Sequence, residues 1–170
     1  MKLKFSTQKK KKFIDKALLN FKWIGLLVNM FPNCKIINCT RNPIDICLSN
    51  YKNIFTSHRL NFSYNLKNIG TYYNLYKNIM KHWNNLYPNK ILNFNYEALT
   101  ENSKEKTKEL LDFCELKWDK NCLNFFNNKR TITTASFAQV RSPIYKSSVN
   151  SWEKYKDHLG PLLEIIDIKN

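Results

Sequence analysis

The residue best placed to do chemistry in this chain is an arginine at the end of an apolar run. Ile36 and Ile37 lie in a short apolar stretch of the kind that forms a buried parallel strand. Asn42 and Pro43 follow the arginine, and they read as a helix cap with proline at the first helical position. This order predicts that Arg41 lies where a buried strand becomes a helix.

A junction of this kind suits an anion. Free backbone N–H groups at a helix N-terminus, the positive end of the helix dipole and a guanidinium fork together favour a phosphate. The Ser49 hydroxyl, two turns along the predicted helix, is expected to reach the same group. The alternative is a surface arginine after a strand. The local sequence does not decide between the two, because strand, Arg, cap and Pro is a common α/β junction.

The elements that position Arg41 alternate between strands and helices, as in a parallel sheet covered on both faces. The expected strands are residues 13–15, 34–40 and 91–96. The expected helices are residues 21–31, 43–55, 66–87, 102–113 and 119–126, and a last helix after Trp152 closes the domain. The helix 66–87 has the clearest pattern, because apolar residues recur every three or four positions until Pro88. Residues 131–151 read as a long loop, and such loops are usually functional. The predicted fold class is α/β, with three layers, helix, sheet and helix, around a parallel sheet.

Composition sets limits on the partners. The chain has 170 residues and 43% hydrophobic content, enough for one domain with a substantial core. A net charge of +15 raises nucleic acid or an anionic membrane as partners. The lysines are scattered, however, and asparagine is equally abundant, a bias that A+T-rich codons produce. The run from Lys9 to Lys12 is either a polyanion patch or a solvated lead-in.

Neither nucleic acid nor a membrane is expected as the partner. The aromatic residues of the helix 66–87 follow its core stripe, which favours packing over base stacking. The apolar stretch 17–31 contains Asn20, Lys22 and Asn29 and is shorter than the ~20 residues of a membrane span. A signal-like role for the basic start and this stretch is the alternative.

Cysteine usage indicates a reducing, cytoplasmic compartment. The five cysteines form an odd set without a Cys-x-x-Cys pair, and they read as buried thiols. They are Cys34, Cys39, Cys47, Cys114 and Cys122. No metal is expected, because no His, Cys or carboxylate set has the spacing of metal ligands. The three histidines, His58, His82 and His158, are expected to be structural or solvated.

Several segments in a fixed order resemble the sulfotransferases, particularly the bacterial branch similar to tyrosylprotein sulfotransferases. Two of them are Asn20-Phe21-Lys22-Trp23-Ile24-Gly25-Leu26 and, further along, Arg41-Asn42-Pro43. The others lie at residues 13–16, 31–33, 66–83, 96–97, 110–114 and 134–152. The likeness spans residues 12–163, and it implies a P-loop-hydrolase-like sulfotransferase fold.

One family element has no counterpart in the sequence. The resemblance implies an initial strand, a phosphosulfate-binding loop of the Arg-Ser-Gly-Thr-Thr type and a helix. Residues 1–12 are rich in lysine and contain no glycine. We therefore expect an N-terminally truncated chain, with a basic lead-in at residues 1–12 and a partial sulfotransferase domain at residues 13–170. A missing inner strand leaves open sheet edges, which predicts association with an N-terminal fragment or with a second copy.

The resemblance also implies roles for single residues, and the co-substrate would be 3′-phosphoadenosine 5′-phosphosulfate. Arg41 and Ser49 would clamp its 3′-phosphate, Lys146 would reach the same phosphate, and Tyr96 would lie beside the nucleotide. Lys16 would lie near the leaving oxygen and Ser136 near the phosphosulfate, and both are the expected catalytic residues. Without the resemblance, Tyr96 is equally well a core tyrosine, and Lys16 and Lys146 do not stand out among the many lysines.

Two positions depart from the family pattern. Position 53, basic in the tyrosylprotein branch, is Asn53, and position 151, basic in many relatives, is Ser151. The family's usual acceptor-side base belongs to the part without a counterpart here.

The expected function is transfer of a sulfuryl group to a hydroxyl acceptor, which is a protein tyrosine, a glycan or a small molecule. The activity of this chain by itself is in doubt. The alternatives are a non-catalytic phosphoadenosine-binding remnant and, less favoured, a basic nucleic-acid-binding module.

Overall fold

The computed structural model describes residues 12–128 and 141–166. Two strands, β1 (Ile36–Thr40) and β2 (Ile91–Asn95), form a parallel pair in register from Ile36 opposite Ile91 to Thr40 opposite Asn95. The helices are α1 (Ile24–Met30), α2 (Pro43–Tyr51), α3 (Leu66–Leu86), α4 (Tyr96–Glu101), α5 (Ser103–Phe113) and α6 (Gly160–Leu163). Shorter 3₁₀ helices are Asn20–Trp23, His58–Tyr64, Lys120–Cys122, Phe125–Asn127 and Ser151–His158.

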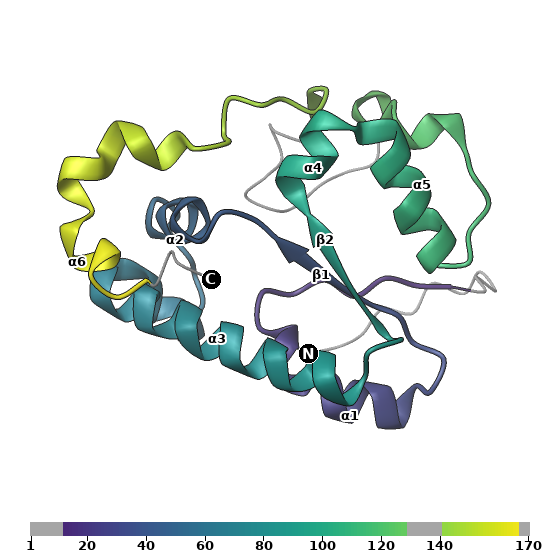
Figure 1. Cartoon of the computed structure of the whole chain (residues 1–170), viewed down its shortest axis with the longest axis horizontal. Helices are drawn as coiled ribbons and strands as arrows, with labels where there is room; N and C mark the ends of the chain where they lie inside the picture. Colours follow the sequence, from purple (N-terminus) through teal and green to yellow (C-terminus); the bar gives the residue numbers. More distant parts are fainter. Residues whose placement is uncertain (1–11, 129–140, 167–170) are drawn as a thin grey trace.

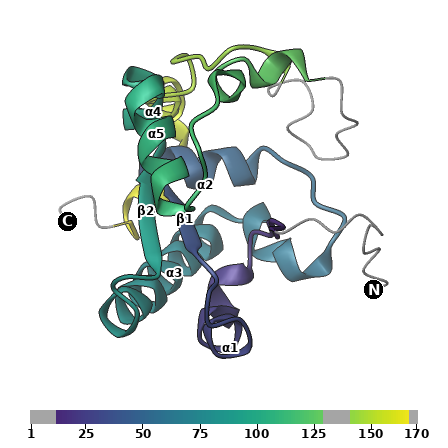
Figure 2. The same cartoon turned by 90° about the vertical axis from the view of Figure 1, so that its right-hand side faces the viewer.

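The prediction of an α/β chain with parallel strands is confirmed. The helices α2 and α3 form the crossover between the two strands, as parallel pairing requires. In Figure 1, α1 and α3 run below the strand pair and α4 and α5 lie above it; Figure 2 shows the same order from the side. The three-layer arrangement around a larger sheet stays a prediction.

The long helix α3 joins two clusters of buried side chains. Its first half packs Ile69 against α2 and α6, where Ile44, Leu48 and Leu162 are buried. Its second half packs Met80 against α1 and the start of β2. The predicted apolar stripe along this helix is therefore confirmed.

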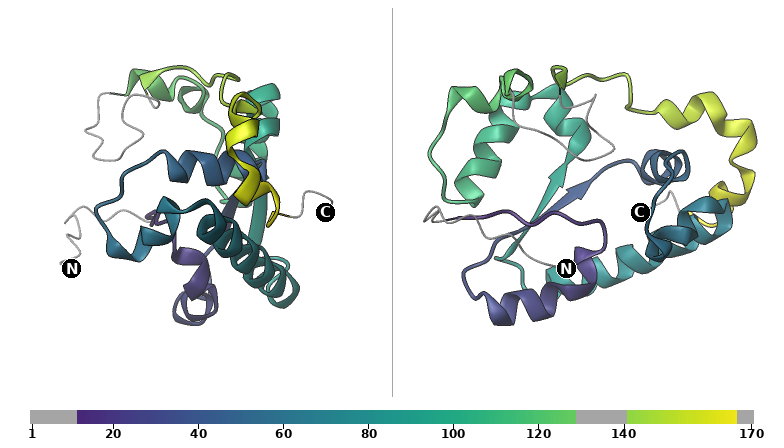
Figure 3. Two further views of the ribbon diagram at one scale, coloured as in Figure 1. Left: turned by 90° about the vertical axis from the view of Figure 1, so that its left-hand side faces the viewer. Right: turned by 180° about the vertical axis from the view of Figure 1, so that it is seen from behind.

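The segment after residue 141 crosses the molecule. Figure 3 shows that this green to yellow part of the chain runs from the α4 side past α2 to α3. It is held there by Leu159 and Leu162, whose side chains are at most 2% exposed in the cluster with α2 and α3. The closing helix is confirmed in part, as the 3₁₀ helix Ser151–His158 followed by the short α6.

The strand expected at residues 13–15 is wrong. The structure has no strand there, and Phe13 and Ile14 are 76% and 90% exposed. Asp15 accepts a hydrogen bond from the Asn20 side chain at 3.0 Å, a local contact that closes a turn. Three apolar-rich residues form a strand only where a neighbour offers backbone partners, and the described residues offer none at this place.

Other boundaries differ because local hydrogen bonds end the helices. The helix α2 ends at Tyr51 instead of residue 55, and Ile54 beyond it is 92% exposed. The capping box expected at Asn102 does not form, because Asn102 ends the unpredicted helix α4 and its backbone N–H donates to the Ala98 carbonyl at 2.9 Å. Asp119 does cap a helix, through a 2.8 Å bond from the Asn121 N–H, but that helix is a single 3₁₀ turn.

Only part of the prediction of buried thiols holds. All five cysteines are free, Cys47 is buried and Cys39 is exposed, because β1 alternates its side chains and turns Cys39 to its open face. Among the described residues, no helix has the length and apolar character needed to cross a bilayer. Within the same residues, no group of three or more His, Cys, Asp or Glu side chains is placed to hold a metal ion.

Candidate functional site

The predicted junction between strand and helix is confirmed at Arg41. The arginine directly follows β1, and Asn42 caps α2 with its side-chain oxygen. That oxygen accepts the backbone N–H groups of Ile44 at 3.0 Å and Asp45 at 3.2 Å, while Pro43 occupies the first helical turn. The Ile46 N–H donates to the Asn42 carbonyl and proline has no N–H, so the expected free N–H groups are not present in this first turn. The helix dipole alone makes this end of α2 favourable for negative charge.

The end of the second strand supports the same junction. Parallel strands end at a common edge, so the start of α4 lies beside the start of α2. There, Glu97 accepts the Asn42 backbone N–H at 2.8 Å with one carboxylate oxygen and the Asn95 side chain at 3.0 Å with the other. These bonds tie the two strand ends together and fix the backbone next to Arg41.

The guanidinium of Arg41 is enclosed by three groups. One nitrogen lies 3.5 Å from the Asp45 carboxylate and donates to the Ser148 carbonyl. The ring of Tyr96 lies below the guanidinium, 5.1 Å from its carbon, and the Tyr96 hydroxyl lies 3.0 Å from the Ser148 hydroxyl. The Arg41 Nε–H is buried and has no hydrogen-bond partner. A buried charged donor without a partner is costly, so this nitrogen is a candidate contact for a ligand.

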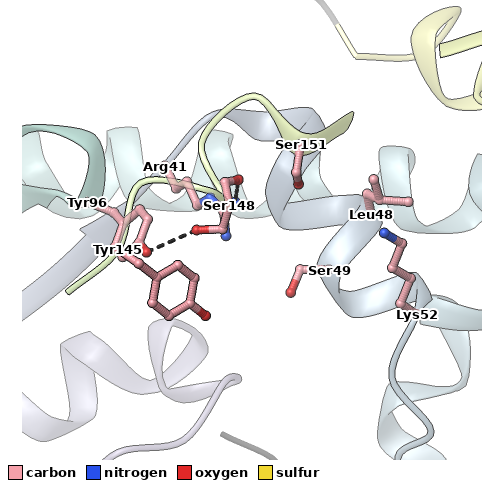
Figure 4. A pocket seen from close by; sticks show the side chains of 8 residues that line it. All are labelled: Arg41, Leu48, Ser49, Lys52, Tyr96, Tyr145, Ser148 and Ser151. Atoms are coloured by element: carbon pink, nitrogen blue, oxygen red, sulfur yellow. Dashed lines mark hydrogen bonds between the residues drawn. The ribbon is translucent and has the colours of Figure 1, made fainter. Parts of the chain in front are cut away.

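A cavity of about 220 Å³ opens beside Arg41 (Figure 4). Its lining residues come from the end of β1, from α2, from the start of α4 and from the late segment: Arg41, Leu48, Ser49, Lys52, Tyr96, Tyr145, Ser148 and Ser151. Figure 4 shows Arg41, Tyr96 and Ser148 grouped on one side and Ser49 and Lys52 on the other.

The donors around the cavity fit a phosphate. Arg41 and Lys52 carry positive charge, Ser49 carries a hydroxyl donor, and none of the described lining residues has a carboxylate. The volume is below the ~300–1,000 Å³ of a whole ligand pocket. The described residues therefore enclose room for a phosphate and its immediate attachment, and not for a complete nucleotide.

Comparison with known proteins identifies the family. A family model described as "Sulfotransferase family" matches residues 2–120, which is more than half of the chain. The chain belongs to the sulfotransferase family. An uncharacterized protein of Aquifex aeolicus (strain VF5) is also similar, with 41% identity over 157 residues. That match covers 91% of this chain and 21% of the relative, so the chain spans about a fifth of the relative's length.

The structure brings three of the six predicted site residues to the cavity, and all three lie in the part of the chain that the sulfotransferase model matches. Arg41, Ser49 and Tyr96 lie within residues 2–120, and the structure brings all three to the cavity wall. Their assigned contacts with the nucleotide stay predictions. Tyr96 is more than a core tyrosine, because its ring contacts Arg41 and its hydroxyl contacts Ser148 at the cavity.

Two of the other three predicted residues do not line this cavity. Lys16 and Lys146 are exposed and do not line it, and Ser136 lies outside the described residues. Their roles in a sulfotransferase stay predictions. The backbone of Lys146 lies close to the site, because its carbonyl accepts the Val149 N–H at 2.9 Å in the turn that presents Ser148.

Sequence reasoning missed Lys52, which lies at the cavity. The family pattern directs attention to position 53, but the Asn53 amide donates to the Ser49 backbone carbonyl at 2.7 Å. Lys52 is three residues after Ser49, and this spacing places the two on one helix face. Its ammonium lies 3.8 Å from the centre of the Tyr155 ring, which holds it beside the cavity. Helical spacing was the signal that would have identified it.

Neither Cys47 nor a second cavity offers further chemistry to the site at Arg41. Burial raises the pKa of the Cys47 thiol to about 12, so it is a protonated core group at neutral pH. The second cavity, of about 250 Å³, lies beside the starts of the two strands and includes Lys35 and Glu115. A 3.0 Å contact with Lys35 lowers the pKa of the Glu115 carboxyl, which keeps this carboxylate ionised on the surface.

Proposed function

We propose that this chain forms the part of a sulfotransferase that recognises the 3′-phosphate of 3′-phosphoadenosine 5′-phosphosulfate. The observation that carries the proposal is that Arg41, whose buried Nε–H has no partner among the described residues, lines a cavity together with Ser49 and Lys52. The second phosphate distinguishes this donor from ordinary adenine nucleotides, so a site for it is the feature that such an enzyme needs.

Each group contributes a different part of the recognition. The guanidinium is permanently charged and planar, so it holds two phosphate oxygens in a defined orientation. The start of α2 adds the positive end of its dipole, and the Ser49 hydroxyl adds a neutral donor. Lys52 adds a second positive charge from the next turn of α2. The ring of Tyr96 supports the guanidinium from below.

The proposed reaction moves a sulfuryl group between two oxygens. The bond from sulfur to the bridging phosphate oxygen breaks, a new bond forms from sulfur to the acceptor hydroxyl, and the hydroxyl proton passes to a base. In this proposal Lys16 stabilises the leaving oxygen and Ser136 contacts the phosphosulfate. The acceptor is a protein tyrosine, a glycan or a small molecule, and likeness to the tyrosylprotein branch favours the first. The five free thiols support a cytoplasmic location.

Calorimetry on the purified chain tests the recognition of the 3′-phosphate. Adenosine 3′,5′-bisphosphate should bind more tightly than adenosine 5′-monophosphate. Arg41→Ala should reduce the affinity for the bisphosphate by about ten- to a hundredfold, as expected for loss of a charged fork worth ~1.5–3 kcal/mol. Arg41→Lys should recover only part of the affinity, because a lysine keeps the charge and loses the fork.

Arg59→Ala is the matched control, because Arg59 is exposed on the 3₁₀ helix His58–Tyr64 and does not line the cavity. Equal affinities for the two nucleotides, or an equal loss in the Arg41 and Arg59 variants, would contradict the proposal.

A non-catalytic phosphoadenosine-binding protein is the second candidate, because the cavity is smaller than a whole nucleotide pocket. A transfer assay with radiolabelled sulfate over phenols and glycans separates the two. Turnover of about 1–10³ per second is typical of enzymes and would exclude the non-catalytic alternative. The nucleic-acid alternative is less favoured, because Tyr73, Tyr76 and Trp83 pack into the two core clusters instead of forming an exposed stacking face.

A further inference from the structure

A buried carboxylate lies directly behind the phosphate-binding candidate. Asp45, in the first turn of α2, is 1% exposed and receives contacts from four donors. One oxygen accepts the Asn150 backbone N–H at 2.8 Å and lies 3.5 Å from the Arg41 guanidinium. The other accepts the Ser151 hydroxyl at 2.9 Å and the Trp152 backbone N–H at 3.0 Å. Both oxygens are therefore used fully within the protein.

Three of these donors are more than 100 positions away in the sequence. Asn150, Ser151 and Trp152 are consecutive, so the carboxylate holds one short piece of the late segment against the start of α2. Asn150 has a φ of 55°, in the left-handed region, and this turns its N–H and that of Trp152 toward the same carboxylate. The preceding Ser148 then reaches Arg41 and Tyr96.

A carboxylate at this place works against anion binding if charge is the only consideration. It lies in contact with Arg41 and offsets part of the attraction that the guanidinium exerts on a phosphate. Burying it also has a large desolvation cost, which the four donors must offset. The arrangement favours phosphate binding only if Asp45 improves the geometry by more than it weakens the charge.

We propose that Asp45 is a positioning residue for the phosphate site. It holds the Arg41 guanidinium by one edge, and its bonds to Asn150, Ser151 and Trp152 fix this part of the late segment beside the cavity. The inference rests on the proposed function and adds to it a residue that does not itself contact the ligand. It also gives Ser151 a role, because this residue lines the cavity and its hydroxyl donates to Asp45.

Asp45→Asn separates positioning from charge, because loss of positioning should lower the affinity for the phosphate and loss of the negative charge should raise it. An asparagine still accepts the bonds of Ser151 and Trp152 with its carbonyl, but it turns an N–H₂ group toward the Asn150 N–H and Arg41. If the charge dominates, the variant should bind adenosine 3′,5′-bisphosphate more tightly. If positioning dominates, binding should weaken about tenfold or more. Ser151→Ala, which removes one bond and keeps both charges, should weaken binding about two- to fivefold.

Calorimetry and amide hydrogen exchange on the full chain test the inference together. Asp157→Asn is the control, because it removes the same charge from an exposed position in the 3₁₀ helix Ser151–His158. Its affinity should match that of the unmodified chain. In Asp45→Asn without nucleotide, the amide of Asn150 should lose protection because its acceptor oxygen is replaced, while α3 stays protected as the sign of an intact fold.

The outcomes are distinguishable. Bisphosphate binding in Asp45→Asn that is equal to or tighter than in the unmodified chain overturns the inference and leaves the proposed function in place. Unchanged protection at Asn150 overturns it without reference to any ligand. An unmodified chain without preference for the bisphosphate refutes the proposed function instead, while the exchange data still report whether Asp45 fixes the late segment.

Discussion

Replacing Tyr96 tests how the late segment and Arg41 are held together. The side chain makes two separable contacts: its ring lies 5.1 Å from the Arg41 guanidinium carbon, and its hydroxyl lies 3.0 Å from the Ser148 hydroxyl. Tyr96→Phe removes only the second contact, and Tyr96→Leu removes both. The Tyr51→Phe control makes the same chemical change at a 42% exposed position at the end of α2.

The geometry sets the expected magnitudes. A neutral hydrogen bond contributes ~0.5–1.5 kcal/mol, so Tyr96→Phe should lower the free energy of unfolding by about 1 kcal/mol. A cation over an aromatic ring contributes ~0.5–1 kcal/mol when exposed and ~2 kcal/mol when desolvated. The Arg41 side chain is only 18% exposed, so the upper half of that range applies. Tyr96→Leu should therefore lower stability by about 2–3 kcal/mol in total.

Urea unfolding and calorimetry with adenosine 3′,5′-bisphosphate measure the two consequences. The affinity should fall in both variants, and more in Tyr96→Leu than in Tyr96→Phe, because the leucine variant also loses the ring beside the Arg41 guanidinium. Ser148→Ala completes a double-mutant cycle, and the double variant with Tyr96→Phe should be no weaker than either single variant. Additive losses would show that the two hydroxyls do not interact. Equal losses in the Phe and Leu variants would refute the role of the ring.

Three further predictions concern the scaffold. Gly25→Ala places a Cβ 2.8 Å from the Trp83 ring, so the overpacking cost of ~1–3 kcal/mol should exceed the ~1 kcal/mol gain in helix propensity and lower stability. In the control Gly160→Ala the new Cβ meets nothing within 4 Å, so equal urea midpoints for the two variants would contradict the prediction. Burial raises the pKa of Cys47 to about 12, so the free energy of unfolding should be highest below about pH 8.5 and fall as the pH rises from there toward 12, by at most ~1.4 kcal/mol per pH unit. Urea unfolding at several pH values should show a shallower decline in Cys47→Ala. The two strands have no further strand partner within residues 12–128 and 141–166, and Ile37 is 38% exposed. Light scattering should therefore show self-association that increases with salt and weakens in Ile37→Lys. A monodisperse monomer at all salt concentrations would rule out association through the sheet.

Local sequence signals predicted the junction that carries Arg41. A cap by Asn42, proline at the first helical turn and an apolar strand before them involve contacts within four residues, so the chain specifies them wherever the segment lies. The same holds for α3, whose 3.6-residue period follows from helix geometry. These signals were sufficient for the α/β class, for both strands and for the helix N-terminus.

The predictions that failed concern features that depend on contacts with distant parts of the chain. The expected strand at residues 13–15 has suitable residues, but strands exist only in pairs. Lys52 is one of many lysines until the packing of α2 turns its face toward the cavity. In the same way, exposure of Cys39 depends on which face of β1 receives a covering helix.

The sequence by itself therefore determined an arginine held at the start of a helix, and the tertiary structure decided what that arginine can do. Asp45 reads in the sequence as an acidic residue in a first helical turn, a common and unremarkable position. Its three donors at positions 150–152 arrive only because Leu159 and Leu162 bury themselves against α2 and α3 and carry the late segment across the molecule. Hydrophobic burial is not directional, so it brings distant segments together without any local signal, and hydrogen bonds then select the geometry.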